Sequence, residues 1–199
     1  MIAQTSQDLL RWNEGTSSIW KKHLHSRPEL TTYPCDIRGG ETVADLLQHI
    51  VAVELSYSER LNGEHETPFE EIPKISVDSL YEFHDRALKK LRVLEGETDA
   101  FWSERIDFET RGGQFSATLR VVFAHCLLHS IRHNGQVATL LRKENAGVSA
   151  MFDYLAFGDA GRMQNLDTST PDEFRGSSSC LKENGRSQSS VQCDNVQCA

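Results

Sequence analysis

The stretch His125-Cys-Leu-Leu-His129-Ser-Ile-Arg-His133-Asn-Gly-Gln136 carries three histidines at intervals of four residues. It lies within Phe115 to Lys143, where apolar residues recur with the period of a helix. Residues four apart lie on one helix face, one turn apart, so their imidazoles can converge on a single metal ion. Histidine is a mediocre helix former, and a helix seldom concentrates it without a reason. The stretch therefore predicts a metal site on a long helix.

The three histidines face different surroundings on this predicted helix. His129 and His133 fall inside its apolar stripe, and His125 falls at the edge of the stripe. An unpaired polar ring inside a core is costly, so the inward pair favours metal ligands over two hydrogen-bonded core histidines. We expect His125 to support the site or face the substrate. Three other roles stay open for it: a ligand, an acid or base at the site mouth, and an ordinary surface histidine.

Apolar periodicity predicts three more helices, at about residues 4–25, 42–61 and 76–94. Thr42 followed by Asp45 resembles a capping box, and Ser76 can cap the third helix. Residues 106–113 read as a connector that has room for a short extended piece. Four amphipathic helices with short to medium links predict an all-α four-helix bundle, in which metal sites are built from side chains on facing helices.

The 199 residues are enough for one domain and a tail. We expect the domain at residues 1–157, with residues 151–157 as a last apolar cluster that docks on the bundle. Residues 158–199 are rich in Ser, Gly, Asn, Gln and Asp and poor in apolar side chains. Such a segment buries too little surface to offset its ordering entropy, so it predicts a low-complexity, disordered tail.

Composition and charge exclude several classes of protein. The net charge of −8 and the pI of about 5.5 argue against nucleic acids and anionic membranes as partners. The sequence contains neither an apolar run of the length of a membrane span nor a secretory signal, which leads us to expect a cytoplasmic protein. Five cysteines without a zinc or disulfide spacing pattern predict free thiols in a reducing compartment.

Two ligands from one helix need a third from elsewhere. His49, on the flank of the stripe at residues 42–61, is the best candidate. Three protein ligands leave positions for water or substrate, which is typical of a catalytic metal site. Glu54 suits two readings equally, a carboxylate that orients a metal-bound imidazole and a flanking surface residue. Cys126 is expected to be a small buried hydrophobe rather than a metal thiolate. The remaining histidines lie in polar surroundings and are expected to be solvated: His23, His25, His65 and His84.

The segment from His125 to Arg142 resembles the last-helix signature of the DinB-like (YfiT-like) superfamily. That signature is a histidine, then H-x-x-x-H, then a Gln-containing triplet and a leucine-rich turn that ends in Arg. Asn134-Gly135-Gln136 departs mildly from the usual Arg-Gly-Gln or Trp-Ala-Gln. His49 with Glu54 five residues on resembles the helix-two signature of the same family. The resemblance covers residues 1–157.

This resemblance implies a four-helix bundle, often dimeric, with a divalent metal held by three histidines, here His49, His129 and His133. Characterised relatives include thiol-dependent S-transferases and a mycothiol-dependent isomerase. We therefore expect a metal-dependent enzyme that transfers a thiol to a small electrophile, or a related hydrolase, with His125 as a proton carrier. Zinc, nickel or iron and a low-molecular-weight thiol are the expected cofactors. The alternative is a non-catalytic metal- or ligand-binding homodimer in stress response.

Overall fold

A computed structural model of the chain describes residues 5–37, 40–74, 76–110, 112–148 and 154–157. The described residues are mostly helical, as predicted, with a small two-stranded sheet that the prediction lacked. The predicted tail at residues 158–199 lies outside the described residues. The elements in order are α1 (Ser6–Ser26), η1 (Pro28–Thr32), α2 (Val43–Leu61), η3 (Phe69–Glu71), α3 (Val77–Val93), η4 (Leu94–Gly96), α4 (Asp99–Ser103), β1 (Arg105–Thr110), β2 (Gly113–Thr118), α5 (Leu119–Lys143) and α6 (Tyr154–Phe157).

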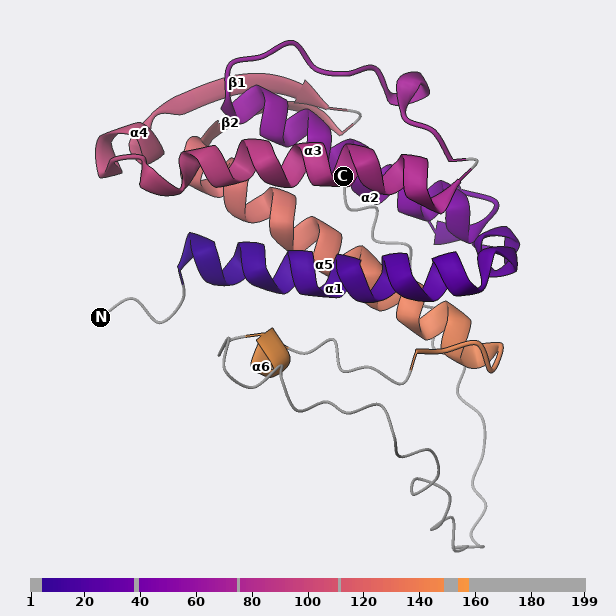
Figure 1. Ribbon diagram of the computed structural model, residues 1–199. Helices are drawn as coiled ribbons and strands as arrows, with labels where there is room; N and C mark the ends of the chain where they lie inside the picture. Colours follow the sequence, from indigo (N-terminus) through magenta and orange to yellow (C-terminus); the bar gives the residue numbers. More distant parts are fainter. Residues whose placement is uncertain (1–4, 38–39, 75, 111, 149–153, 158–199) are drawn as a thin grey trace, which may run out of the picture.

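The long helices α1, α2, α3 and α5 pack on one another through their apolar faces. α2 packs against both α3 and α5, and α1 packs against α5 and α3 (Figure 1). A hydroxyl side chain caps the start of each of the four, and the capping box predicted at Thr42 and Asp45 is confirmed. Within the described ranges, no helix combines the length and apolar character that a membrane span requires.

The first residues of the predicted last helix form a strand instead. Residues 115–118 belong to β2, which pairs antiparallel with β1, and α5 begins only at Leu119. Gly113 closes the hairpin with φ of +115°, a backbone region that favours glycine. The rings of Phe108 and Phe115 stack 5.9 Å apart across the two strands. Such a cross-strand pair stabilises a hairpin but has no periodic signature in either strand alone.

The apolar core has two halves with a polar layer between them. One half contains Trp20, Val43, Leu55 and Val137, and the other contains residues from the opposite ends of the same helices. The buried polar side chains of the intervening layer come from all four long helices: Asn13, Thr16 and Ser17 of α1, Glu54 and Ser58 of α2, His84 of α3, and His129, Ser130, His133 and Asn134 of α5. The fold therefore buries polar chemistry at mid-height, where the histidine pair lies.

The described part of the predicted docking cluster, α6, packs against α1. Trp12 and Tyr154 meet edge to face at 5.4 Å between ring centroids. A methyl group on Gly15 would overlap the ring of Phe157, which is buried. Gly15 thus pays the helix penalty of glycine in exchange for a close aromatic contact.

This contact predicts opposite outcomes for two glycine-to-alanine changes. Gly135→Ala, in α5, places a methyl group with no described residue outside its own helix turn within 4 Å, and it should raise the unfolding free energy by about 0.5 to 1 kcal/mol. Gly15→Ala gains the same helix propensity but displaces Phe157, so we expect a net loss of about 1 kcal/mol. Urea denaturation of both variants measures the difference. Equal stabilisation by the two changes would contradict the docking of α6.

Candidate metal centre

α2 and α5 face each other and bring three histidines together. The Nε2 atoms of His49 and His129 lie 3.2 Å apart, and those of His129 and His133 lie 3.1 Å apart. One nitrogen from each ring falls within 4.8 Å of the other two, so the three rings could hold a metal ion. His129 and His133 are buried, and His49 is partly exposed. The structure thus brings together the three residues that the sequence predicted as ligands.

The spacing of these nitrogens agrees with a tetrahedral metal. Two imidazole nitrogens at 2.0–2.1 Å from one tetrahedral zinc ion lie about 3.4 Å from each other. The observed separations of 3.1 and 3.2 Å are close to that value. Without a metal, two imidazole nitrogens at this distance repel each other through their lone pairs unless one of them carries a hydrogen. The donor set therefore fits a divalent transition metal.

Gln136 fixes the orientation of one of the three rings. The Nδ1 atom of His133 lies 2.5 Å from Oε1 of Gln136, which can only accept a hydrogen bond, so Nδ1 carries the ring proton. The Nη2 group of Arg132 lies 3.1 Å from Nε2 of His133 and donates to it. This tautomer makes Nε2, the atom that faces His129, an acceptor, and a metal bound there would take the lone pair that now accepts from Arg132. Sequence reasoning gave Gln136 no role, although its place three residues after His133 on a helix is the signal for such a contact.

His129 stays uncharged at neutral pH. Burial, followed by the nearby His133, lowers the pKa of His129 to about 2. Its Nδ1 atom is buried and has no hydrogen-bond partner among the described residues. A neutral imidazole is the form that binds metals, so this ring needs no proton release before it acts as a ligand.

A cavity of about 600 Å³ opens beside the cluster, with His49 and His129 in its lining. Its volume lies within the range of small-molecule sites. Aromatic side chains from α2, η3 and the hairpin make up much of its wall: Tyr57, Phe69, Phe108 and Phe115. Sequence reasoning missed this wall, because the hairpin that completes it was read partly as helix.

His125 lines the same cavity but lies outside the cluster of three. Its ring centroid is 5.7 Å from that of His129 and 5.4 Å from that of Tyr57. The residue is exposed, as its place at the edge of the stripe predicted. Partial burial of the ring, followed by the charge of Arg132, lowers the pKa of His125 below its usual value of 6.5. The ring is therefore uncharged and accessible from the cavity at neutral pH.

Glu54 and His84 form a buried ion pair that sequence reasoning did not foresee. Oε2 of Glu54 lies 2.6 Å from Nδ1 of His84, and Oε1 accepts a hydrogen bond of 2.9 Å from Asn13. Glu54 is fully buried, so the surface reading of this residue is wrong. His84 is 3 % exposed, so its predicted solvation is wrong as well. His84 lies four residues after Leu80 and four before Leu88, inside the apolar stripe of α3, and this spacing is the signal that could have found it.

Cys126 is a buried thiol, as predicted. It is completely buried, and its Sγ lies 3.8 Å from the main-chain oxygen of Glu54. Burial raises the pKa of this thiol well above its usual value. The protonated form is therefore stable here, and Cys126 acts as a small core residue.

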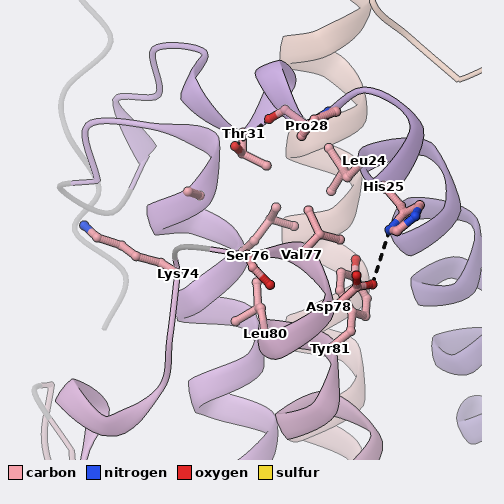
Figure 2. Close-up of a pocket in the computed structure, with 12 residues that line it drawn as sticks. Leu24, His25, Pro28, Thr31, Lys74, Ser76, Val77, Asp78, Leu80 and Tyr81 are labelled. Carbon is pink, nitrogen blue, oxygen red and sulfur yellow. Dashed lines mark hydrogen bonds and ion pairs between the residues drawn. The ribbon is translucent and has the colours of Figure 1, made fainter.

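A second, smaller cavity of about 300 Å³ lies between the end of α1 and the start of α3. Figure 2 shows His25 reaching across its edge to Asp78, while Lys74 extends away from the other labelled side chains. The amino group of Lys74 instead binds Asp45 at 2.5 Å. None of the three clustered histidines lines this cavity, which separates it from the candidate metal centre.

Comparison of the chain with known protein families matches residues 1–166 to the DinB family. A search of curated proteins finds none that matches. The matched range contains the three histidines and every residue that lines the larger cavity. The resemblance seen in the two helix signatures is confirmed.

Proposed function

Because the chain belongs to the DinB family, we propose that it binds a divalent transition metal through His49, His129 and His133 and acts as a metal-dependent enzyme. The observation that carries this proposal is the convergence of three imidazoles, two of which, His49 and His129, line a cavity of small-molecule size. Three protein ligands leave coordination positions for a reactant. The reaction we propose is transfer of a low-molecular-weight thiol to a small electrophile, with hydrolysis as the close variant.

A bound divalent metal would supply Lewis acidity, which lowers the pKa of a thiol or water that reaches it. The residues of the chain supply the rest. Gln136 holds the ring of His133 in the tautomer with Nε2 unprotonated, which is the form that binds a metal, and burial keeps His129 neutral. The aromatic wall limits water around the reactants. His125 lines the cavity and is uncharged at neutral pH, and in this proposal it accepts the proton that a nucleophile releases.

The four long helices suit the architecture of the family. We propose that α1, α2, α3 and α5 form the four-helix bundle typical of the family, within a domain at residues 1–157. The hairpin between α4 and α5 is then an addition that closes the cavity rather than part of the bundle. Pairing of two copies into a homodimer stays a prediction.

Elemental analysis tests the metal site directly. Protein purified without added metal should carry about one equivalent of zinc, nickel or iron, and His129→Ala should lose most of it. His65→Ala is the matched control, because His65 is exposed in the loop after α2 and lies outside the cluster. It should retain the metal of the wild type. If the wild type carries no metal and His129→Ala has the same metal content as the wild type, the proposal is refuted.

Turnover assays separate the enzyme from a non-catalytic binding protein. A panel of low-molecular-weight thiols is incubated with chlorodinitrobenzene, and product is followed with and without chelator. Chelator-sensitive thiol consumption supports a transferase. Release of the same electrophile's hydrolysis product without thiol supports the hydrolase variant. Stoichiometric metal without any turnover would favour the non-catalytic alternative.

A further inference from the structure

Tyr57 brings a hydroxyl group to the aromatic wall of the cavity. Its ring contacts the rings of Phe108, at 5.9 Å between centroids, and His125, at 5.4 Å. The guanidinium of Arg60 lies 4.9 Å from the same ring and is itself held by Glu66, which accepts hydrogen bonds from Nε at 2.9 Å and from Nη2 at 2.6 Å. Tyr57 is partly exposed and lines the cavity, so the position of its side chain is fixed but accessible.

The hydrogen of this hydroxyl is available to a ligand. A side-chain hydrogen bond joins the hydroxyl of Tyr57 to Arg60. A guanidinium can only donate, so the oxygen of Tyr57 accepts and its own hydrogen points elsewhere. The nearby carboxylate of Glu66 accepts from Arg60 and Ser56, and within the described ranges no acceptor is found for the O–H group of Tyr57. Burial raises the pKa of Tyr57 above its usual value of 10.0, so the hydroxyl keeps this hydrogen at neutral pH.

We propose that Tyr57 determines substrate specificity by donating a hydrogen bond from its hydroxyl to an uncharged carbonyl oxygen of an aromatic small molecule. This inference rests on the proposed function in taking the cavity as the substrate site. A flat apolar ligand suits the cavity, because aromatic rings make up much of its wall. A few well-placed polar groups in such a wall fix the orientation of a ligand, and the hydroxyl of Tyr57 is one of them.

The place of Tyr57 on α2 decides which oxygen of a ligand reaches it. Tyr57 follows His49 by eight residues, which puts it about 12 Å further along the helix at about 1.5 Å per residue. An anionic group of a ligand gains more from a divalent cation than from a neutral hydroxyl, so it binds at the histidine cluster. The oxygen at the distant end is then the uncharged one. The ligand that fits both ends is an elongated aromatic carbonyl compound.

Two matched probes test this inference by equilibrium dialysis on chelator-treated protein. β-Acetylnaphthalene carries a carbonyl oxygen, and β-isopropenylnaphthalene has the same shape with a methylene group in its place. Tyr57→Phe removes only the hydroxyl, so it should weaken binding of the ketone about fivefold and change binding of the hydrocarbon by less than about twofold. Tyr33→Phe is the matched control, because Tyr33 packs against the core and does not line the cavity. It should leave both affinities unchanged.

The carbonyl stretching frequency of bound β-acetylnaphthalene gives a second measurement, which a merely structural role of Tyr57 would not change. A hydrogen bond from the hydroxyl should lower this frequency in the wild type, and Tyr57→Phe should return it to the value in an apolar solvent. The inference is overturned if Tyr57→Phe weakens both probes equally, if it leaves the ketone affinity unchanged, or if the wild type binds neither probe.

β-Naphthoate tests the choice of an uncharged oxygen. On zinc-loaded protein, Tyr57→Phe should change its affinity by less than about twofold, because the carboxylate binds at the histidine cluster. A fivefold loss would place the carboxylate at Tyr57 and overturn that choice. Selective loss of ketone binding in chelator-treated Tyr57→Phe supports this inference even where elemental analysis refutes the proposed function.

Discussion

Replacing His84 by leucine is expected to lower the free energy of unfolding by about 3 to 5 kcal/mol. The change removes the imidazole that lies 2.6 Å from Oε2 of Glu54 and leaves that carboxylate fully buried without its counter-charge. The hydrogen bonds from Asn13 and Ser130 remain, but neutral donors do not replace a charge. Urea denaturation at neutral pH measures the loss.

A surface ion pair on the same helix supplies the control. Arg92 of α3 binds Glu14 of α1, and both side chains are about half exposed, at 51 % and 46 %. Arg92→Ala should therefore cost less than about 1 kcal/mol, because exposed ion pairs contribute little. A loss in His84→Leu no larger than that in Arg92→Ala would show that the buried pair adds no stability.

The double variant Glu54→Leu/His84→Leu lacks both ionisable groups, so its difference in stability from the wild type reports the contribution of the pair. It should recover part of the loss seen in His84→Leu, since no uncompensated charge remains in the core. Burial opposes ionisation of both groups. Their mutual attraction and hydrogen bonds outweigh it, so the pKa of Glu54 falls below 4.5 and the pKa of His84 rises above 6.5.

These two directions define a pH window for the pair. A lowered carboxyl pKa adds stability above its unfolded value of 4.5, and that stability is lost as the pH falls through the folded pKa. A raised histidine pKa adds stability below 6.5, and that stability is lost as the pH rises through the folded pKa. Wild type should therefore exceed the double variant most between about pH 4.5 and 6.5. A difference that keeps growing above that range would contradict the assignment.

The helical part of the fold could be predicted from the sequence, because its signals are local. The capping box at Thr42 and Asp45 and the cap at Ser76 each lie within four residues of the chain. The hairpin could not, since its pairing depends on Phe108 meeting Phe115 and on contact of Tyr57 with Phe108 at 5.9 Å. Non-local contacts of this kind leave no periodic signal in a short segment.

The candidate site also has parts that local spacing predicts and parts that depend on contacts between residues distant in the sequence. His129 and His133 were predictable because four-residue spacing on one helix fixes their relative position. His49 followed from its helix face and from the family resemblance. The partners of Glu54 lie 41 and 30 residues away in the chain, on α1 and α3. Nothing in the sequence near Glu54 indicates them.

His125→Ala is expected to lower turnover of the metal-loaded protein by about 10²- to 10⁴-fold while metal content stays at the wild-type level. The ring lines the cavity 5.7 Å from that of His129 but does not belong to the cluster of three. Its lowered pKa favours a base over an acid, because the uncharged form predominates at neutral pH. A cation nearby would shift that pKa in the same direction. Stopped-flow product formation and elemental analysis, made on the same preparation, measure both quantities.

The pH dependence of turnover distinguishes a proton acceptor from a side chain that merely shapes the cavity. A base is active when uncharged, so the rate should rise with pH through a pKa below 6.5 and then level off. His125→Ala should lose that rising limb, and His125→Gln, which keeps a polar side chain of similar reach, should lose it too. His25→Ala, an exposed histidine at the second cavity, should keep it. If the rate of His125→Ala still rises with pH, another group accepts the proton. If His125→Ala also loses its metal, His125 is a metal ligand.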